Sequence, residues 1–130
     1  MNDNSLFFLC SLIEFIGRQQ KQRRGRIVEL LGENVIKRIY DYADVFHCEP
    51  IEKVADDFIL RCQIPMDDYD NVKCCRYEVP DYWEIGEVYE RLIEDLKKSS
   101  GKEMIDCIKE VYASWINDAI SNYNTDFYYQ

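Results

Sequence analysis

The chain contains 130 residues with a mass of 15.6 kDa, which is the usual size of a single domain. Hydrophobic residues make up 47% of it, enough to bury a core and too many for a disordered chain. The 25 acidic residues outnumber the 16 basic residues and give a net charge of -9 at pH 7, which argues against a general nucleic-acid binder and against a protein that binds anionic membranes.

The first predicted element is a helix over residues 4–20. Its apolar residues cover most of the helix circumference, which is typical of a central helix covered on two sides. They form two stripes, one of Leu6, Leu9, Ile13 and Ile16 and one of Phe8, Leu12 and Phe15. Ser11, Glu14 and Arg18 form a polar line at spacings of three and four residues. We expect this line to face solvent, with Glu14 and Arg18 paired on it.

Three more helices are predicted in the first half of the chain. A short helix over residues 26–31 is followed by Gly32, a typical C-terminal cap. Residues 34–47 form the next helix, and Pro50 is expected at the first position of another, which continues to residue 62. The short connections favour packing between neighbouring helices, so residues 1–62 are predicted to form an N-terminal group of helices.

The second half begins with a predicted irregular loop over residues 63–83, because Pro65 and the acidic run 67–71 are typical of turns. A regular apolar stripe then predicts a helix from residue 84 to a break at residues 99–101. Ser100 and Glu103 have the spacing of a capping box, which indicates the start of a last helix. We expect a helix pair over residues 84–122 and an aromatic tail over residues 123–130.

Together these elements predict an all-α fold in one helical domain over residues 1–130. The expected architecture is an irregular bundle of five or six helices with a central N-terminal helix and one long middle loop.

The longest apolar stretch, residues 6–16, is too short to span a bilayer, which takes about 20 residues. No basic residue precedes it, so we expect no secretory signal and a cytoplasmic protein without membrane contact. In that compartment the six cysteines are expected to stay reduced and to serve as small apolar residues, because their spacing does not fit a zinc site; they are Cys10, Cys48, Cys62, Cys74, Cys75 and Cys107. We therefore predict no metal and no cofactor.

Catalytic patterns are missing from the sequence. His47 is the one histidine, and its neighbour Cys48 would point about 100° away from it on a helix, so the two cannot easily act together. No glycine-rich phosphate loop or dinucleotide fingerprint is present, and the acidic run 67–71 lacks the glycine and distal glutamate of a calcium-binding loop. The prediction is a protein that is not an enzyme and has no catalytic residues.

One basic cluster stands out in this acidic chain. It lies within nine residues without an intervening acid and consists of Arg18, Lys21, Arg23, Arg24 and Arg26. Arginines at a helix junction can grip phosphates, so one interpretation is a nucleic-acid contact. The other, which we favour, is a solvated loop that partly neutralises its acidic surroundings, because the rest of the chain repels nucleic acid.

Aromatic residues at loop-like positions are candidate anchors for a partner protein. They are Tyr77, Tyr82 and Trp83 in the middle of the chain and Phe127, Tyr128 and Tyr129 in the tail. Aromatic anchors on an acidic surface suit a basic partner. A place in the core remains open for each of them, and for the tail an interface is slightly favoured.

Residues 12–14, 39–47 and 54–59 form a pattern with an early Ile-Glu pair, a Tyr-Asp pair followed by a histidine, and a late acidic segment. This pattern resembles that of a family of small uncharacterised proteins of gut Firmicutes that contain a domain of unknown function, although Phe46 replaces a leucine of the family pattern and no glycine follows His47. Such proteins lie in gene cassettes beside ADP-ribosyltransferase-like toxin domains. The resemblance implies an antitoxin-like or accessory role and carries over no catalytic residue.

The predicted function is therefore a non-enzymatic protein–protein interaction module, with an antitoxin-like role suggested by the resemblance. Its partner would be another protein, such as a toxin encoded nearby, or a second copy of the chain in a homodimer. The alternative is a nucleic-acid-binding regulator that uses the corner between Arg18 and Arg26.

Overall fold

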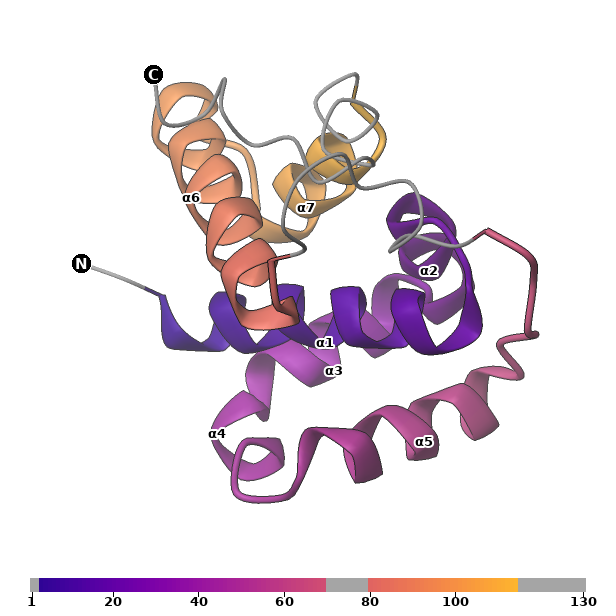
Figure 1. Ribbon diagram of the computed structural model, residues 1–130. Helices are drawn as coiled ribbons and strands as arrows, with labels where there is room; N and C mark the ends of the chain where they lie inside the picture. The colour runs from indigo at the N-terminus through magenta and orange to yellow at the C-terminus, as the bar shows by residue number, and fades with distance from the viewer. Residues whose placement is uncertain (1–2, 70–79, 115–130) are drawn as a thin grey trace.

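The structure is a computed structural model that describes residues 3–69 and 80–114 (Figure 1). These residues form seven helices and no strand, which confirms the predicted all-α fold. The helices are α1 (Asn4–Gln20), α2 (Arg24–Leu31), α3 (Glu33–Asp41), α4 (Ala43–Phe46), α5 (Ile51–Cys62), α6 (Tyr82–Ser100) and α7 (Met104–Tyr112). Helix α7 ends at Tyr112, before the predicted end at residue 122, and the aromatic tail lies outside the described residues.

Helix α1 is central, as its apolar circumference predicts. It lies across the middle of the molecule, with α6 and α7 on one side and α4 and α5 on the other (Figure 1). It contacts α2, α3, α4, α5 and α6, and its most extensive packing is against α6. Both predicted stripes lie in the core apart from half-buried Phe15; the buried members are Leu6, Phe8, Leu9, Leu12, Ile13 and Ile16.

The polar line of α1 does not face solvent, so this part of the prediction is wrong. Helix α6 covers it, and Ser11 and Glu14 are 0% and 1% exposed. The two helices come this close because Gly86 has no side chain: a Cβ atom there would lie 2.1 Å from Oγ of Ser11. A polar stripe thus forms the interface with α6, where Arg18 and Arg24 neutralise Glu14.

Several helix boundaries differ from those predicted. The expected helix 34–47 is divided into α3 and α4 at Tyr42, whose backbone leaves the helical region at φ -113° and ψ 22°. Pro50 lies just before α5 rather than in its first turn. Helix α6 starts at Tyr82, inside the predicted loop, because the side chain of Asp81 accepts a hydrogen bond from the amide of Glu84 at 2.8 Å.

The break between α6 and α7 lies where it was predicted, but its chemistry is different. Gly101 ends α6 in the left-handed conformation, with φ 72°. The predicted capping box does not form: Oγ of Ser100 accepts a hydrogen bond from the amide of Lys102 at 3.2 Å, and Glu103 precedes α7 without a side-chain cap. Ser100 therefore stabilises the turn after α6 and does not cap α7, which is the role that its spacing from Glu103 predicts.

The start of the middle loop is fixed to the corner between α1 and α2. The amides of Asp67 and Tyr69 donate hydrogen bonds to the carbonyls of Gln20 and Lys21, at 2.9 and 3.0 Å. The side chain of Gln20 also donates to the carbonyl of Ile64 at 2.9 Å. Residues 64–69 are therefore irregular, as expected, but anchored. None of the described helices is both long and apolar enough to cross a membrane.

Candidate functional site

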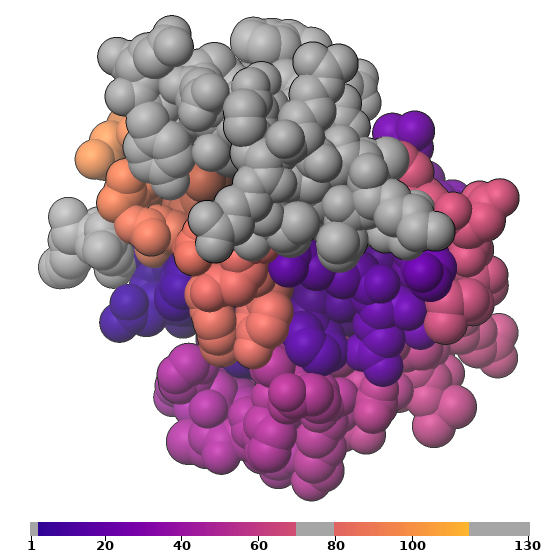
Figure 2. Space-filling view, viewed as in Figure 1, coloured from indigo at the N-terminus to yellow at the C-terminus, as the bar shows by residue number. Residues whose placement is uncertain are grey.

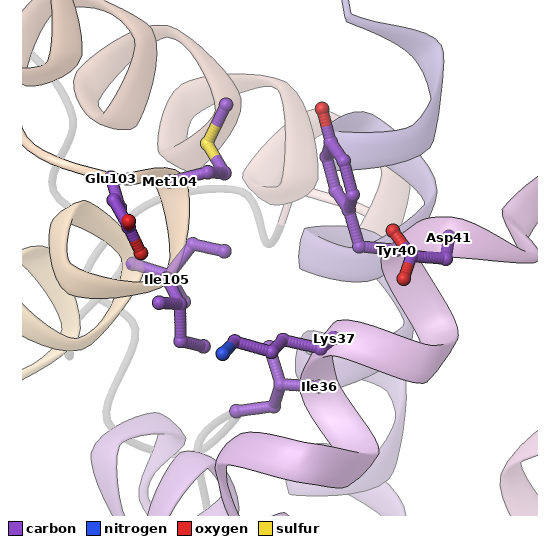
Figure 3. Close-up of a pocket in the computed structure, with 8 residues that line it drawn as sticks. Ile36, Lys37, Tyr40, Asp41, Glu103, Met104 and Ile105 are labelled. Atoms are coloured by element: carbon purple, nitrogen blue, oxygen red, sulfur yellow. The ribbon is translucent and has the colours of Figure 1, made fainter.

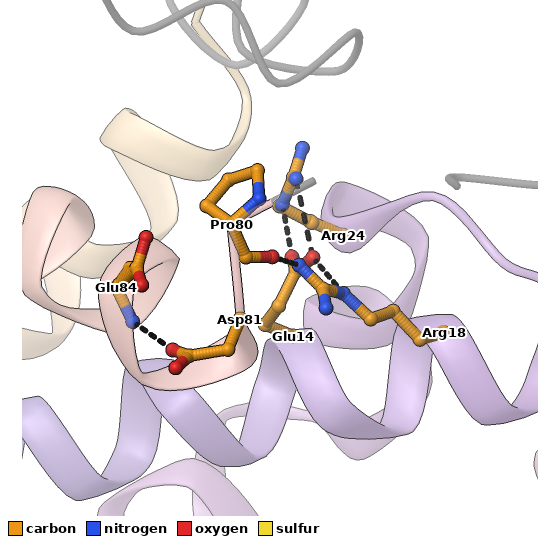
Figure 4. A network of polar contacts seen from close by, with 6 residues as sticks. All are labelled: Glu14, Arg18, Arg24, Pro80, Asp81 and Glu84. Atoms are coloured by element: carbon orange, nitrogen blue, oxygen red, sulfur yellow. Dashed lines mark hydrogen bonds and ion pairs between the residues drawn. The ribbon is translucent and has the colours of Figure 1, made fainter. Parts of the chain in front are cut away.

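The basic corner does not form one exposed patch, because Glu14 lies at its centre (Figure 4). Arg24 is 3% exposed, and its Nε pairs with one carboxylate oxygen of Glu14. Nε of Arg18 donates to the other oxygen at 2.8 Å, and Nη2 of Arg18 donates to the carbonyl of Pro80 at 2.5 Å. Both interpretations of the corner are thus wrong for Arg24, which is neither a solvated cation nor accessible to a phosphate.

The carboxyl group of Glu14 is held ionised in this cluster. Burial by itself would raise its pKa, but the charges and hydrogen bonds of Arg24 and Arg18 outweigh burial and lower the pKa below its ordinary value. A buried guanidinium and a buried carboxylate therefore compensate each other. We interpret this cluster as structural, because it joins α1 to α2 and to the start of α6.

The other three cations of the corner lie on the surface. The guanidinium of Arg23 lies 4.3 Å from the centre of the Tyr69 ring, which is cation–π geometry. Arg26 pairs with Glu29 at 2.9 Å. Lys21 is exposed at the C-terminal cap of α1. The structure thus separates the five residues into two that pair with buried Glu14, which are Arg18 and Arg24, and three surface cations.

A pocket of about 240 Å³ lies between α3 and α7, with Ile36, Ile105 and Tyr40 among its walls (Figure 3). A second pocket, of about 350 Å³, shares Ile36 with it and extends toward Lys109. The charges between them are already paired, since Glu33 contacts Lys37 at 3.4 Å and Lys109 at 3.3 Å. These pockets therefore have an apolar floor, and the cations Lys37 and Lys109 at their edges are paired with Glu33.

Five aromatic rings from three segments of the chain lie close together, and we call this group of rings the aromatic surface. It consists of Phe7 and Phe15 of α1, His47 after α4, and Tyr82 and Trp83 of α6. Trp83 lies 5.4 Å from Phe7, 6.1 Å from His47 and 5.1 Å from Tyr82, measured between ring centres. Tyr82 meets Phe15 edge-on at 5.1 Å.

These rings are packed against one another and still reach solvent. Phe7, Phe15, Tyr82 and Trp83 are half-buried, and His47 is exposed. The first turn of α6, in salmon, lies beside α1 and above the magenta part of the chain that contains α4 (Figure 2). The aromatic surface therefore lies where three helices meet.

Acidic and apolar side chains lie near this surface. Exposed Asp81 and Glu84 directly precede and follow the pair of Tyr82 and Trp83. On α4, Asp44 is exposed and Val45 is 59% exposed. The site thus combines ordered rings, an aliphatic side chain and negative charge, which are the features expected of a surface that binds a basic protein segment.

Two of the aromatic anchors expected from the sequence, Tyr82 and Trp83, belong to this surface, and each is partly core and partly surface. Tyr77, Phe127, Tyr128 and Tyr129 lie outside the described residues. The contributions of Phe7 and His47 were not predicted from the sequence.

One signal could have found Phe7: it lies four residues before Ser11, so a large aromatic residue stands on the otherwise polar line of α1. For His47 the sequence holds no such signal, because its ring neighbours Phe8 and Trp83 are distant along the chain. Comparison with known proteins adds no further assignment, since no family model, curated protein or solved structure matches the chain significantly.

Proposed function

We propose that the protein is a non-enzymatic protein–protein interaction module that binds a basic partner through the aromatic surface. The observation that carries the proposal is the cluster of half-buried rings around Trp83, with Asp81 and Glu84 beside it. An antitoxin-like role is the narrower form of this proposal, and its first partner to test is a toxin encoded nearby.

The geometry supports binding because the rings are already ordered. Trp83 touches three other rings, so little side-chain entropy remains to be lost when a partner covers it. Tryptophan and tyrosine carry a large share of the free energy in protein interfaces. The neighbouring carboxylates would speed the approach of a positively charged partner.

No observation favours the nucleic-acid alternative to the same degree. Of its five basic residues, Arg24 is buried and Arg18 is half-buried against Glu14 and Pro80. The remaining exposed cations, Lys21, Arg23 and Arg26, would have to act alone against a net charge of -9.

The test is co-expression of the tagged chain with the product of its neighbouring gene, followed by co-purification and titration calorimetry. Trp83→Ala should weaken binding by about 30-fold, the effect of losing an interface anchor of about 2 kcal/mol. Leu60→Ala is the matched control, because Leu60 is 79% exposed on α5 and is not part of the aromatic surface.

Circular dichroism must show that both variants keep the helical fold of the wild type. Under that condition, unchanged partner binding by Trp83→Ala would remove the aromatic surface from the proposal. Equal loss in both variants would show that the effect is not specific to the rings.

A further inference from the structure

A third pocket, of about 470 Å³, adjoins the aromatic surface. Its walls include the rings of Phe7, Phe8 and His47, and Asn4, Ser5, Ala43 and Asp44 complete the lining. Phe8 meets His47 edge-on at 5.6 Å, and Phe7 and His47 both contact Trp83 of the aromatic surface. The volume lies in the range of pockets that hold a small ligand or a single large side chain.

The chemistry of this lining favours a cation. The faces of aromatic rings attract positive charge, and Asp44 adds a carboxylate. In the part of the chain that the structure describes, this carboxylate has no hydrogen bond or ion pair, in contrast to Glu33 beside the other pockets. Asn4 and Ser5 add side-chain oxygens that can accept hydrogen bonds from a ligand.

The start of α1 lies at this pocket, and its positive helix end would by itself oppose a cation. Asp3 offsets it: one carboxylate oxygen of Asp3 accepts a hydrogen bond from the amide of Leu6 at 2.9 Å, and the other accepts one from the hydroxyl of Tyr40 at 2.5 Å. Asp3 thus compensates the helix end, and Asp44 is the carboxylate in the lining of the pocket.

We propose that this pocket receives an arginine side chain of the basic partner, with the guanidinium beside Asp44 and against the rings of Phe7, Phe8 and His47. The inference rests on the proposed function and deepens it, because it names the side chain that the partner contributes. Arginine suits the site better than lysine, since its planar guanidinium stacks on rings and carries five donors for the surrounding oxygens.

The test uses a small probe and the purified chain without any partner. His47 is the one histidine, so the imidazole signals in the NMR spectrum belong to it without further assignment. N-acetyl-arginine amide is titrated at constant pH against two analogues: N-acetyl-citrulline amide, which has nearly the same shape without the charge, and N-acetyl-norleucine amide, which is apolar.

The expected result is a saturable shift of the His47 signals with the arginine compound at millimolar concentration, and at least about threefold weaker binding of citrulline. Asp44→Asn should weaken arginine binding about two- to fivefold, which is the range for a partly solvated ion pair. Asp95→Asn is the matched control, because it removes the same charge from an exposed position of α6 and should leave the affinity unchanged.

Equal binding of arginine and citrulline, or equal binding by the Asp44→Asn variant, would overturn the proposal. Stronger binding of norleucine would assign the pocket to an apolar side chain and also overturn it, as would the absence of any shift up to about 50 mM arginine compound. The proposed function stands in each of these cases if Trp83→Ala still weakens binding of the partner protein, so the failure of one proposal can be distinguished from the failure of the other.

Discussion

Replacing Glu14 by glutamine should destabilise the fold far more than the loss of an ordinary surface charge. Glu14 and Arg24 are 1% and 3% exposed, so the substitution leaves a buried guanidinium without its carboxylate. Breaking a buried ion pair in this way usually lowers the free energy of unfolding by 3–5 kcal/mol. We expect about 3 kcal/mol, because glutamine still accepts one hydrogen bond and Arg18, at 19% exposed, can turn toward water.

The assay is urea unfolding at pH 7, followed by far-ultraviolet circular dichroism. Glu29→Gln is the matched control: it breaks the pair with Arg26, in which the two side chains are 69% and 56% exposed. An exposed pair of this kind contributes less than about 1 kcal/mol. Similar losses in both variants would refute the reasoning, because burial would then make no difference.

Comparing the wild type with Glu14→Gln at different pH values gives a second test, in which the direction of the change in stability is defined. Arg24 and Arg18 lower the pKa of Glu14 in the folded state, against the effect of burial. The stabilisation is therefore complete above the pKa of the unfolded chain and is lost as the pH falls through the folded value. The stability difference between the wild type and Glu14→Gln should narrow below about pH 4, and a difference that widens in acid would contradict this account.

Two further predictions concern the interface between α1 and α6. Gly86→Ala should lower the free energy of unfolding by about 1–3 kcal/mol in thermal or urea unfolding, because the added methyl meets the side chain and backbone of Ser11. A stabilised variant, as expected for alanine at an open helical position, would show that the helices can separate freely. Burial, with Glu94, Glu87 and Asp3 nearby, raises the pKa of Glu90 to about 7, so ionisation of Glu90 destabilises the fold as the pH rises through that value. Glu90→Gln should therefore raise the unfolding free energy at pH 8 by about 1 kcal/mol or more and leave it nearly unchanged at pH 4, and equal effects at both pH values would argue against a raised pKa.

The sequence predicted helix existence well because apolar periodicity reports which residues are buried. The bounds of α1 are those expected, and the break near Gly101 falls in the right place. Helix boundaries that depend on a single side chain were harder to predict from the sequence. Asp81 caps α6, which begins at Tyr82, two residues before the start predicted from the apolar stripe, and nothing in the stripe indicates that cap.

The candidate site was harder to predict than the fold, because it depends on pairs that are distant along the chain. A glutamate within a helix is usually on the surface, and only the packing of α2 and α6 shows that Glu14 has Arg24 as its buried partner. In the same way, Trp83 was a recognisable candidate from its residue type, whereas its contact with His47 depends on how α4 and α6 meet across α1.

The central position of α1 also has a consequence during protein synthesis. Its interface with α6 is complete only when Ser100 has been translated, about 80 residues after the end of α1. At ordinary elongation rates of about 5–20 residues per second, that interval is about 4–16 s. Until α6 has been made, the line that includes Phe7, Ser11 and Glu14 lacks its cover, so a folding intermediate of the nascent chain would expose apolar and charged side chains that α6 covers in the finished protein.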